Sequence, residues 1–333
     1  MRAYLVEHLA GPFTPVELPR PTPAAGQVLV RVHASGVNPL DTKIRSGQAE
    51  HAHQPLPAVL GLDMAGTVEE TGPAIDGSSH TTFHPGDEVY GMVGGVAGIP
   101  GTLAEFVLAD ADLLALKPKS LSMRESAALP LIAITAWEGI VDRANVRTGQ
   151  QVLIHAGAGG VGHIAVQLAV ARGAQVFATV SPDKADLAAQ FGATPIDYRA
   201  LTPEQYVQLH TAGQGFDVIY DTVGGPTIDA SFTAVKPYTG HVISCLGWTT
   251  HSLAPLSFRG ATYSGVFTLM PLLTGRHRQA HGNILRQIAQ LADSGKLRPL
   301  LNDQHFTAAT IAEAHQQVAS GSLGKVVVDL IPD

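Results

Sequence analysis

The sequence predicts an α/β fold that combines a doubly wound parallel sheet with a small β-rich domain. Two observations predict it. Residues 1 to about 120 are rich in glycine and proline and hold short alternating segments, which is typical of a small β-barrel-like domain. Beyond them, apolar strand patterns alternate with helical patterns, and repeated strand–helix units imply a parallel sheet with right-handed crossovers.

Elements near both ends of the chain are expected to form one domain. A long helix should span residues 276–294, with Ile284 and Ile288 on one face and Gly295 as its C-cap. A short helix over 311–318 follows, and a last strand should return to the first domain. The strands expected here are 27–34 (QVLVRVHA), 86–90, 104–108, 113–117 and 325–330.

The middle of the chain alternates between strands and helices. Ser122 and Glu125 form a capping box that opens this stretch with a helix. The strands are nearly continuous runs of Val, Ile and Phe, as expected where both faces of a sheet are covered. The expected strands are 151–156, 175–180, 216–221 and 241–246, and the expected helices are 161–172, 184–191 and one after Pro226.

Composition and charge exclude several classes of protein. The chain has 333 residues and a net charge of −7 without long charge runs, which argues against a nucleic-acid or anionic-membrane surface. No apolar run reaches membrane-spanning length. The single cysteine, Cys245, allows neither an intrachain disulfide nor a multi-cysteine zinc site, and we expect an inert core residue in a cytoplasmic protein.

A glycine-rich loop, HAGAGGVG, lies between a buried strand and an apolar helix and satisfies G-x-G-x-x-G. Glycines allow a tight turn and close approach to a diphosphate, and the helix N-terminus offers free N–H groups to it. A plain strand-to-helix turn with small residues for packing is the alternative. The predicted cofactor contacts here are Gly157, Gly159, Gly160, Val161 and Gly162.

The end of the second strand favours NADPH over NADH. An NAD-binding protein usually places Asp or Glu there, but this chain has Ser181, followed by Asp183 and Lys184. A hydroxyl and an ammonium group suit a 2′-phosphate better than a carboxylate does. Tyr198 and Arg199, after a third short strand, are placed to reach the same group. The alternative for Lys184 is a solvated residue at a helix start.

Four segments carry a family resemblance: SGVNPLDTKIRSG (35–47), GLDMAGTVEETG (61–72), HAGAGGVG (155–162) and DTVGG (221–225). The chain resembles the zinc-independent quinone oxidoreductase branch of the medium-chain dehydrogenase/reductase superfamily. The resemblance implies a GroES-like, partly open β-barrel catalytic domain with an inserted Rossmann domain. It implies a homodimer or homotetramer, with residues 1–120 plus 255–333 in the catalytic domain and 121–254 in the cofactor domain.

The same resemblance implies that no catalytic zinc is present. Zinc-dependent relatives have a cysteine ligand at the position of Asn38, and Gly-His-Glu where this chain has Gly-Leu62-Asp63. A catalytic zinc normally needs three protein ligands. His51 and His53 flank the cleft by the resemblance and leave an adventitious metal as the alternative.

Without a Lewis acid, hydride from NADPH is best donated to an acceptor that is already electrophilic, such as a quinone or an α,β-unsaturated carbonyl. The resemblance places Asn38 in the cleft near the nicotinamide. Lys43 is a candidate proton donor, or else a solvent-exposed residue. For Asp41 and Arg45 we prefer an internal salt bridge that braces their loop.

Further cofactor contacts follow from the resemblance alone, and each has simple packing as its alternative. They are Thr135, Val223, Ser244, Phe267 and Lys325. Trp137 is interpreted as a core or hinge aromatic. Three functions stay open: an NADPH-dependent quinone oxidoreductase, an enone, enal or enoyl-thioester reductase on the same scaffold, and an NADPH-binding protein without turnover.

Overall fold

The computed structural model describes residues 1–73, 83–321 and 323–331, which form two compact units. The first unit is Met1–Leu131 with Leu269–Asp333, and the second is Ile132–Thr268. The boundaries expected at about 120 and 255 lie earlier than these for two reasons. Helix α2 (Met123–Ala127), which the capping box opens, packs on strands of the first unit, and the last strand of the second unit reaches Gly265.

The second unit is built on a six-stranded parallel sheet in the order β11-β10-β9-β12-β13-β14. From β9 the chain runs outward through β10 and β11, then returns to β12 and runs the other way. The carboxyl ends of β9 and β12 therefore form the topological switch point, where α/β sheets bind their ligands. The strands are β9 (Gln151–His155), β10 (Gln175–Val180), β11 (Thr194–Asp197), β12 (Val218–Asp221), β13 (His241–Ser244) and β14 (Thr262–Gly265).

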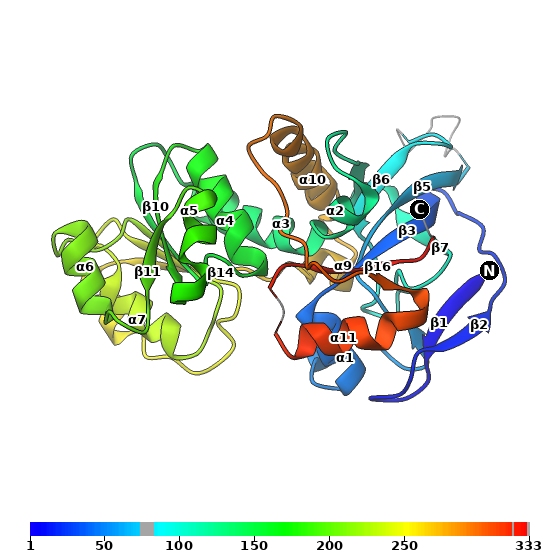
Figure 1. Cartoon of the computed structure of the whole chain (residues 1–333), viewed down its shortest axis with the longest axis horizontal. Coiled ribbons are helices and arrows are strands. Elements are labelled where there is room, and N and C mark those ends of the chain that lie inside the picture. The colour runs from blue at the N-terminus through cyan, green and yellow to red at the C-terminus, as the bar shows by residue number, and fades with distance from the viewer. Residues whose placement is uncertain (74–82, 322, 332–333) are drawn as a thin grey trace. The chain divides into compact units, whose positions relative to one another are not determined.

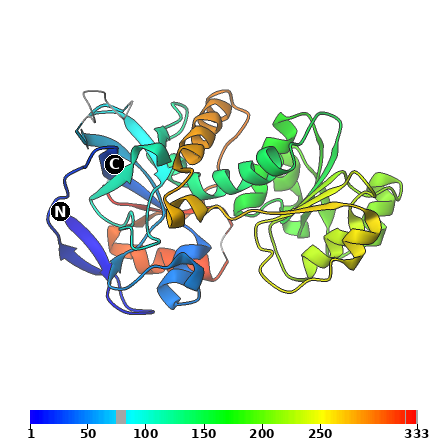
Figure 2. The same cartoon turned by 180° about the vertical axis from the view of Figure 1, so that it is seen from behind.

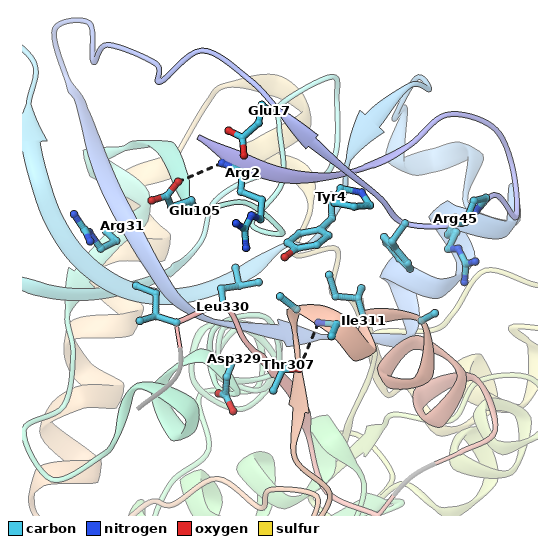
Figure 3. Close-up of a pocket in the computed structure, with 17 residues that line it drawn as sticks. Arg2, Tyr4, Glu17, Arg31, Arg45, Glu105, Thr307, Ile311, Asp329 and Leu330 are labelled. Atoms are coloured by element: carbon cyan, nitrogen blue, oxygen red, sulfur yellow. Dashed lines mark hydrogen bonds between the residues drawn. The ribbon is translucent and has the colours of Figure 1, made fainter.

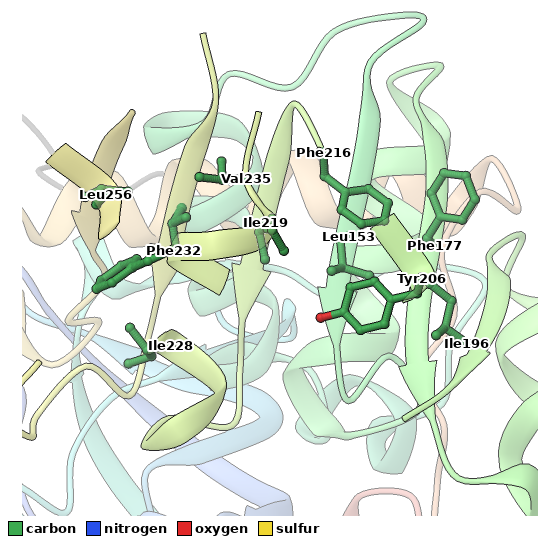
Figure 4. Close-up of a cluster of buried hydrophobic side chains, with 12 residues drawn as sticks. Leu153, Phe177, Ile196, Tyr206, Phe216, Ile219, Ile228, Phe232, Val235 and Leu256 are labelled. Carbon is green, nitrogen blue, oxygen red and sulfur yellow. The ribbon is translucent and has the colours of Figure 1, made fainter. Parts of the chain in front are cut away.

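Helices cover both faces of this sheet. One face carries a buried cluster that includes Leu153, Phe177, Phe216, Ile219 and Phe232 (Figure 4). The rings of Phe177 and Phe216 meet edge to face at 5.5 Å, and each fully buried side chain contributes about 1.5–3 kcal/mol. The helices are α3 (Pro130–Trp137), a π-helix (Glu138–Arg143), α4 (Gly160–Ala171), α5 (Ala185–Gln190), α6 (Pro203–Thr211), α7 (Pro226–Ala234) and α8 (Ala254–Arg259).

The first unit contains a seven-stranded sheet and a three-stranded sheet (Figures 1 and 2). The larger sheet has the order β15-β16-β3-β5-β6-β8, and β7 also pairs with β3. The last strand pairs antiparallel with β3, which confirms the expected return to the first domain. The strands are β1 (Arg2–Val6), β2 (Thr14–Glu17), β3 (Gln27–Val37), β4 (Ala58–Val59), β5 (Asp63–Thr71), β6 (Glu88–Met92), β7 (Phe106–Asp110), β8 (Leu114–Leu116), β15 (Phe306–Thr307) and β16 (Val326–Asp329).

Five α-helices complete the described part of the first unit. The longest, α10, buries Ile284, Leu285 and Ile288, as the sequence pattern predicts, and the Tyr90 hydroxyl donates a hydrogen bond to the Leu285 carbonyl (2.6 Å). The helices are α1 (Pro39–Ser46), α2, α9 (Met270–Thr274), α10 (Arg278–Asp293) and α11 (Ile311–Ala319). Among the described residues, no helix has the length and apolar character needed to cross a bilayer.

Candidate active site

The glycine loop after β9 is shaped by close backbone packing. A Cβ on Gly157 would lie 2.4 Å from the Ala178 Cβ on β10, and one on Gly162 would lie 2.1 Å from the Ala156 carbonyl oxygen. Both distances are shorter than real side-chain contacts allow. These two glycines therefore let the start of α4 approach the sheet.

The N-terminus of α4 is open toward a ligand. Gly159 is its N-cap and provides no side-chain cap, and a Cβ on Gly160 would have its nearest contact at 3.6 Å, with Ile132. The N–H groups of the first helical turn, from Gly160 through Gly162, have no acceptor within the helix, and the helix dipole adds positive potential there. This cradle fits the diphosphate of a dinucleotide.

A cavity of about 460 Å³ adjoins this loop in the second unit. It brings together five predicted cofactor residues from the loops that follow four neighbouring strands. Ser181 is almost fully buried, whereas Tyr198 and Val223 are about half exposed. The five residues are Gly159, Ser181, Lys184, Tyr198 and Val223.

The charges at this cavity are mixed. A hydrogen bond from the Ser181 hydroxyl is the main cause that lowers the pKa of Asp183, and the nearby Lys184 and Arg199 act in the same direction. The Arg199 guanidinium lies over the Tyr198 ring, 5.7 Å from its centroid. Lys184 therefore lines the cavity where the sequence predicts the 2′-phosphate, and its charge and that of Arg199 act on the nearby Asp183 carboxylate.

The loop after β12 is held by a buried carboxylate. The Ser244 hydroxyl donates to Asp221 Oδ2 (2.7 Å) and accepts from the Leu246 N–H (3.0 Å), so its side chain is already bonded within the unit. The Thr222 hydroxyl donates to the carbonyl of His155, at the end of β9 (2.7 Å). The predicted contact at Ser244 therefore lies beside the switch point, with its hydroxyl engaged by Asp221.

Thr135 and Phe267 lie elsewhere in the second unit. The Thr135 and Thr268 hydroxyl oxygens are 2.9 Å apart, and the Tyr220 hydroxyl donates to the Thr135 carbonyl (2.7 Å). Phe267 packs edge to face on Trp248 at 6.4 Å between centroids. Neither residue lines the cavity beside the glycine loop, and their roles stay predictions.

A buried polar network in the first unit contains Asn38 and Lys325. The Asn38 side-chain amide donates to Asp63 Oδ2 (2.9 Å), and its carbonyl oxygen accepts from the Lys325 ammonium. Lys325 also donates to the Val37 carbonyl (3.1 Å), and the Leu131 N–H donates to Asp63 Oδ1 (3.0 Å). Both ends of the Asn38 amide are thus fixed, and Asn38 is fully buried.

Burial sets the electrostatics of this network. It raises the pKa of Asp63 to about 6, against the opposing effect of Lys325, and it lowers the pKa of Lys325. Burial also raises the pKa of Asp41 to about 7, although a hydrogen bond from the Asn38 N–H opposes the shift. Burial therefore disfavours the charged form of all three groups, and the attraction between Lys325 and the two carboxyls opposes that effect.

The predicted salt bridge between Asp41 and Arg45 is wrong. Asp41 Oδ2 accepts the Asn38 N–H (2.8 Å) and caps α1, whereas Arg45 donates twice to the Gly11 carbonyl and lies over the Phe13 ring. Capping takes the carboxyl of Asp41 to the helix N-terminus, away from Arg45 one turn later. Both residues still brace α1, through separate partners.

Four other interpreted residues have plain surroundings. Lys43 is exposed on α1, so its two interpretations stay open. Burial, and secondarily the charge of Asp221, raise the pKa of Cys245 to about 12, which fits an inert thiol. Trp137 is partly buried and donates to Asp142 (3.2 Å). His53 is exposed, and among the described residues no group of three or more His, Cys, Asp or Glu is arranged to hold a metal ion.

A second cavity, of about 1080 Å³, lies in the first unit between β1, β2 and the start of α11 (Figure 3). Two of its charged groups form ion pairs within the unit: Arg31 with Glu69, and Asp329 with Arg124. None of the residues predicted for cofactor binding or catalysis lines it. It is therefore separate from the network around Asn38.

Comparisons with known proteins agree with this geometry. Two family models match: one described as alcohol dehydrogenase GroES-like domain over residues 24–119, and one described as zinc-binding dehydrogenase over residues 191–328. The chain is 32% identical to NAD(P)H oxidoreductase RTN4IP1, mitochondrial, of Danio rerio, over 92% of this chain and 84% of that protein. It is 35% identical to 2-methylene-furan-3-one reductase of Solanum lycopersicum, over 92% and 72%.

A crystal structure of an alcohol dehydrogenase superfamily protein from Novosphingobium aromaticivorans matches with a TM-score of 0.95 and 53% identity, over 99% of this chain and 100% of that one. The fold, the glycine-loop site and these matches define an NAD(P)H-dependent oxidoreductase. The chain belongs to the zinc-independent branch of the medium-chain dehydrogenase/reductase superfamily. The predicted GroES-like and Rossmann fold class is confirmed.

Sequence reasoning missed two buried carboxylates that organise the site, Asp63 and Asp221. Asp63 follows Leu62 in the segment compared with the zinc-binding relatives, and Asp221 opens DTVGG. The role of Asp221 could have been predicted, because a carboxylate at the carboxyl end of a buried strand needs hydrogen-bond donors from the next loop. Asp63 had none, because its main partners, Asn38 and Lys325, are distant in sequence.

Proposed function

We propose that the chain transfers a hydride from NADPH to a quinone without a metal ion. The observation that carries the proposal is the cavity that gathers Ser181, Lys184 and Tyr198 beside Gly159. It presents a hydroxyl and an ammonium group where an NAD-specific site has a carboxylate. The coenzyme supplies the hydride when bound, and the protein supplies orientation and exclusion of water.

The choice of acceptor follows from the donor groups that the chain offers. Asn38 is committed to Asp63 and Lys325 at the position where zinc-dependent relatives carry a ligand. Stabilising an alkoxide without a Lewis acid is difficult, whereas a quinone spreads the incoming charge onto its own oxygens. A quinone is therefore the acceptor whose developing negative charge needs the least stabilisation by the residues present.

A reductase of α,β-unsaturated carbonyls is the second candidate. It is favoured by the 35% identity to a protein named 2-methylene-furan-3-one reductase, whose named substrate is a conjugated enone. Both acceptors take the hydride at an electrophilic carbon or oxygen conjugated to a carbonyl. An NADPH-binding protein without turnover is the alternative from another class.

Steady-state rates separate these candidates. NADPH oxidation would be followed with 1,4-benzoquinone, 9,10-phenanthrenequinone and a series of 2-alkenals, with metal content determined on the same sample. We expect the highest kcat/KM with a quinone and no dependence on added zinc. Higher values with alkenals would select the second candidate. Tight coenzyme binding with flat rates for every acceptor would select the non-catalytic protein.

Replacing Lys184 with alanine should weaken NADPH binding about tenfold and leave NADH binding nearly unchanged. The loss of one partly exposed ion pair with a phosphate has this size. Asp183→Asn should act in the opposite direction, because it removes the carboxylate beside the predicted phosphate position. Fluorescence titration with both coenzymes measures the ratio. Exposed Lys119→Ala is the matched control, and an unchanged ratio in Lys184→Ala contradicts the assignment.

We also propose a homodimer or homotetramer and a cytoplasmic location. The support for assembly is β14, which ends the order of the parallel sheet and leaves one edge without a strand partner among the described residues. Such an edge is a template for pairing with another chain. Light scattering of the purified protein gives the mass of the assembly.

A further inference from the structure

Asp221 is a fully buried charge compensated by hydrogen bonds. Its carboxylate accepts from the N–H groups of Val223 (3.2 Å) and Gly224 (3.0 and 3.1 Å) and from the Ser244 hydroxyl (2.7 Å). Among the described residues, no Lys or Arg forms a salt bridge with it. The N-terminal end of α7, which begins at Pro226, offsets part of the charge. No counter-ion cancels its field locally.

The field of this carboxylate reaches its neighbours. After burial, Asp221 is the next cause that raises the pKa of Cys245 and of Tyr263, both of which would become anions. Burial lowers the pKa of His155 to about 4, and Asp221 opposes that shift because it favours the cation. Groups on β9 and β14 and just after β13 thus experience a potential that disfavours anions and favours cations.

The general geometry of dinucleotide-binding sheets would place the same region beside the reactive half of a bound coenzyme. Ser181, Lys184 and Tyr198, beside which the 2′-phosphate is predicted, follow β10 and β11 on one side of the switch point, and the cavity that they line extends to Val223 after β12. A dinucleotide crosses the sheet at that point, so its other half extends over the carboxyl ends of β12, β13 and β14. Asp221 ends β12, and Ser244, to which it is bonded, ends β13.

We infer that Asp221 is a positioning residue that biases the bound coenzyme toward its oxidised form. The inference rests on the proposed function, because it requires a nicotinamide coenzyme in this crevice. Hydride donation breaks one C–H bond of the ring, sends both electrons of that bond with the hydrogen to the acceptor, and leaves the ring with one positive charge. A fixed negative charge beneath it stabilises this cation and not the neutral reduced ring. The carboxylate therefore favours donation over return of the hydride.

The test compares two affinities in Asp221→Asn, which keeps the shape of the side chain and an acceptor oxygen. NADPH is titrated by its fluorescence, and NADP⁺ by competition with it. The ratio Kd(NADPH)/Kd(NADP⁺) should fall on the order of tenfold, the effect of a unit charge over roughly 10 Å at an effective dielectric constant of about 20. The midpoint potential of the bound couple should rise by about 30 mV.

Two further variants separate charge from shape. Thr222→Ala removes the hydrogen bond between the same loop and the His155 carbonyl but keeps the carboxylate, so its ratio should stay within about twofold of the native one. Val223→Lys adds a cation to the half-exposed side chain of this loop and should lower the ratio as Asp221→Asn does, which keeps the test intact if the latter does not fold. Phosphate contacts cancel in the ratio, because both coenzyme forms carry the same phosphates.

The outcomes distinguish the inference from the function on which it rests. A native-like ratio in Asp221→Asn or Val223→Lys, with both coenzyme forms bound, overturns the inference and leaves the function standing. An equal fall of the ratio in Thr222→Ala also overturns it, because loop order and not charge would be responsible. If the native protein binds neither form, the proposed function itself fails.

Discussion

Replacing Lys325 with methionine is expected to lower the free energy of unfolding at pH 7.5 by about 3–5 kcal/mol, the usual loss when buried carboxyls are left without their compensating charge. The Lys325 ammonium binds the carbonyl oxygens of Asn38 and Val37 and is the cation beside two buried carboxyls. Without it, the folded state must either keep Asp63 and Asp41 protonated at a pH where the unfolded chain ionises both, or bury their charges without compensation. Guanidinium denaturation measures the loss.

The pH dependence of this loss has a fixed sign. Burial already raises the pKa of Asp63 to about 6 and of Asp41 to about 7, and removing Lys325 raises both further. A carboxyl whose pKa is raised in the folded state contributes stability below that pKa and loses it as pH increases. The deficit of Lys325→Met should therefore shrink between pH 7.5 and 5.

A double variant tests whether charge is the cause. Lys325→Met with Asp63→Asn removes a cation and a carboxylate together, and it should cost less than the sum of the two single changes. Lys296→Met, at an exposed site of the same unit, should change stability by no more than about 0.5 kcal/mol. Additive single effects, or a loss under about 1 kcal/mol in Lys325→Met, would contradict the electrostatic account of the network.

The parts of the fold that follow from local patterns were predictable. The strand expected at 175–180 is β10 (Gln175–Val180), and the helix expected at 161–172 is α4 (Gly160–Ala171), because periodicity and the glycine loop fix both. β5 (Asp63–Thr71) was not predicted as a strand. Its sequence, DMAGTVEET, holds one glycine and three acidic residues, and its strand conformation comes from pairing with β3 and β6.

The candidate site likewise contains residues that local patterns predict and residues that only long-range contacts bring together. The glycines and Ser181, Lys184 and Tyr198 follow consecutive strands of one sheet, so topology alone brings them together. The hydrogen bond between Lys325 and Asn38 spans 287 residues, and no local pattern carries it. The mistaken pairing of Asp41 shows this directly: the sequence analysis paired Asp41 with Arg45 to brace a loop, but the segment forms helix α1 and Asp41 caps its N-terminus instead.

His315 should make the protein acid-labile. Burial, and secondarily the charge of Arg45, lower the pKa of His315 to about 3, and its Nδ1 is a buried atom without a hydrogen-bond partner. The imidazole packs on the Phe13 ring at 4.7 Å between centroids. In the unfolded chain the imidazole of His315 binds a proton near pH 6.5, whereas in the folded state it stays unprotonated down to about pH 3. The contribution of His315 to the free energy of unfolding is therefore fully present above pH 6.5 and is lost as the pH decreases from 6.5 to about 3.

The expected loss from this one group is about 3 kcal/mol at pH 4, since each unit of pKa difference is worth about 1.36 kcal/mol. His315→Leu removes the titrating group and keeps an apolar contact with Phe13. The difference in unfolding free energy between the native protein and His315→Leu should therefore change by about 3 kcal/mol, in favour of the variant, between pH 7.5 and 4. His305→Leu, at an exposed site, is the control that shows how the loss of a surface imidazole changes the free energy of unfolding. Parallel pH curves for the native protein and His315→Leu would mean that His315 takes up its proton without unfolding the helix that carries it, and that burial on α11 does not control its charge.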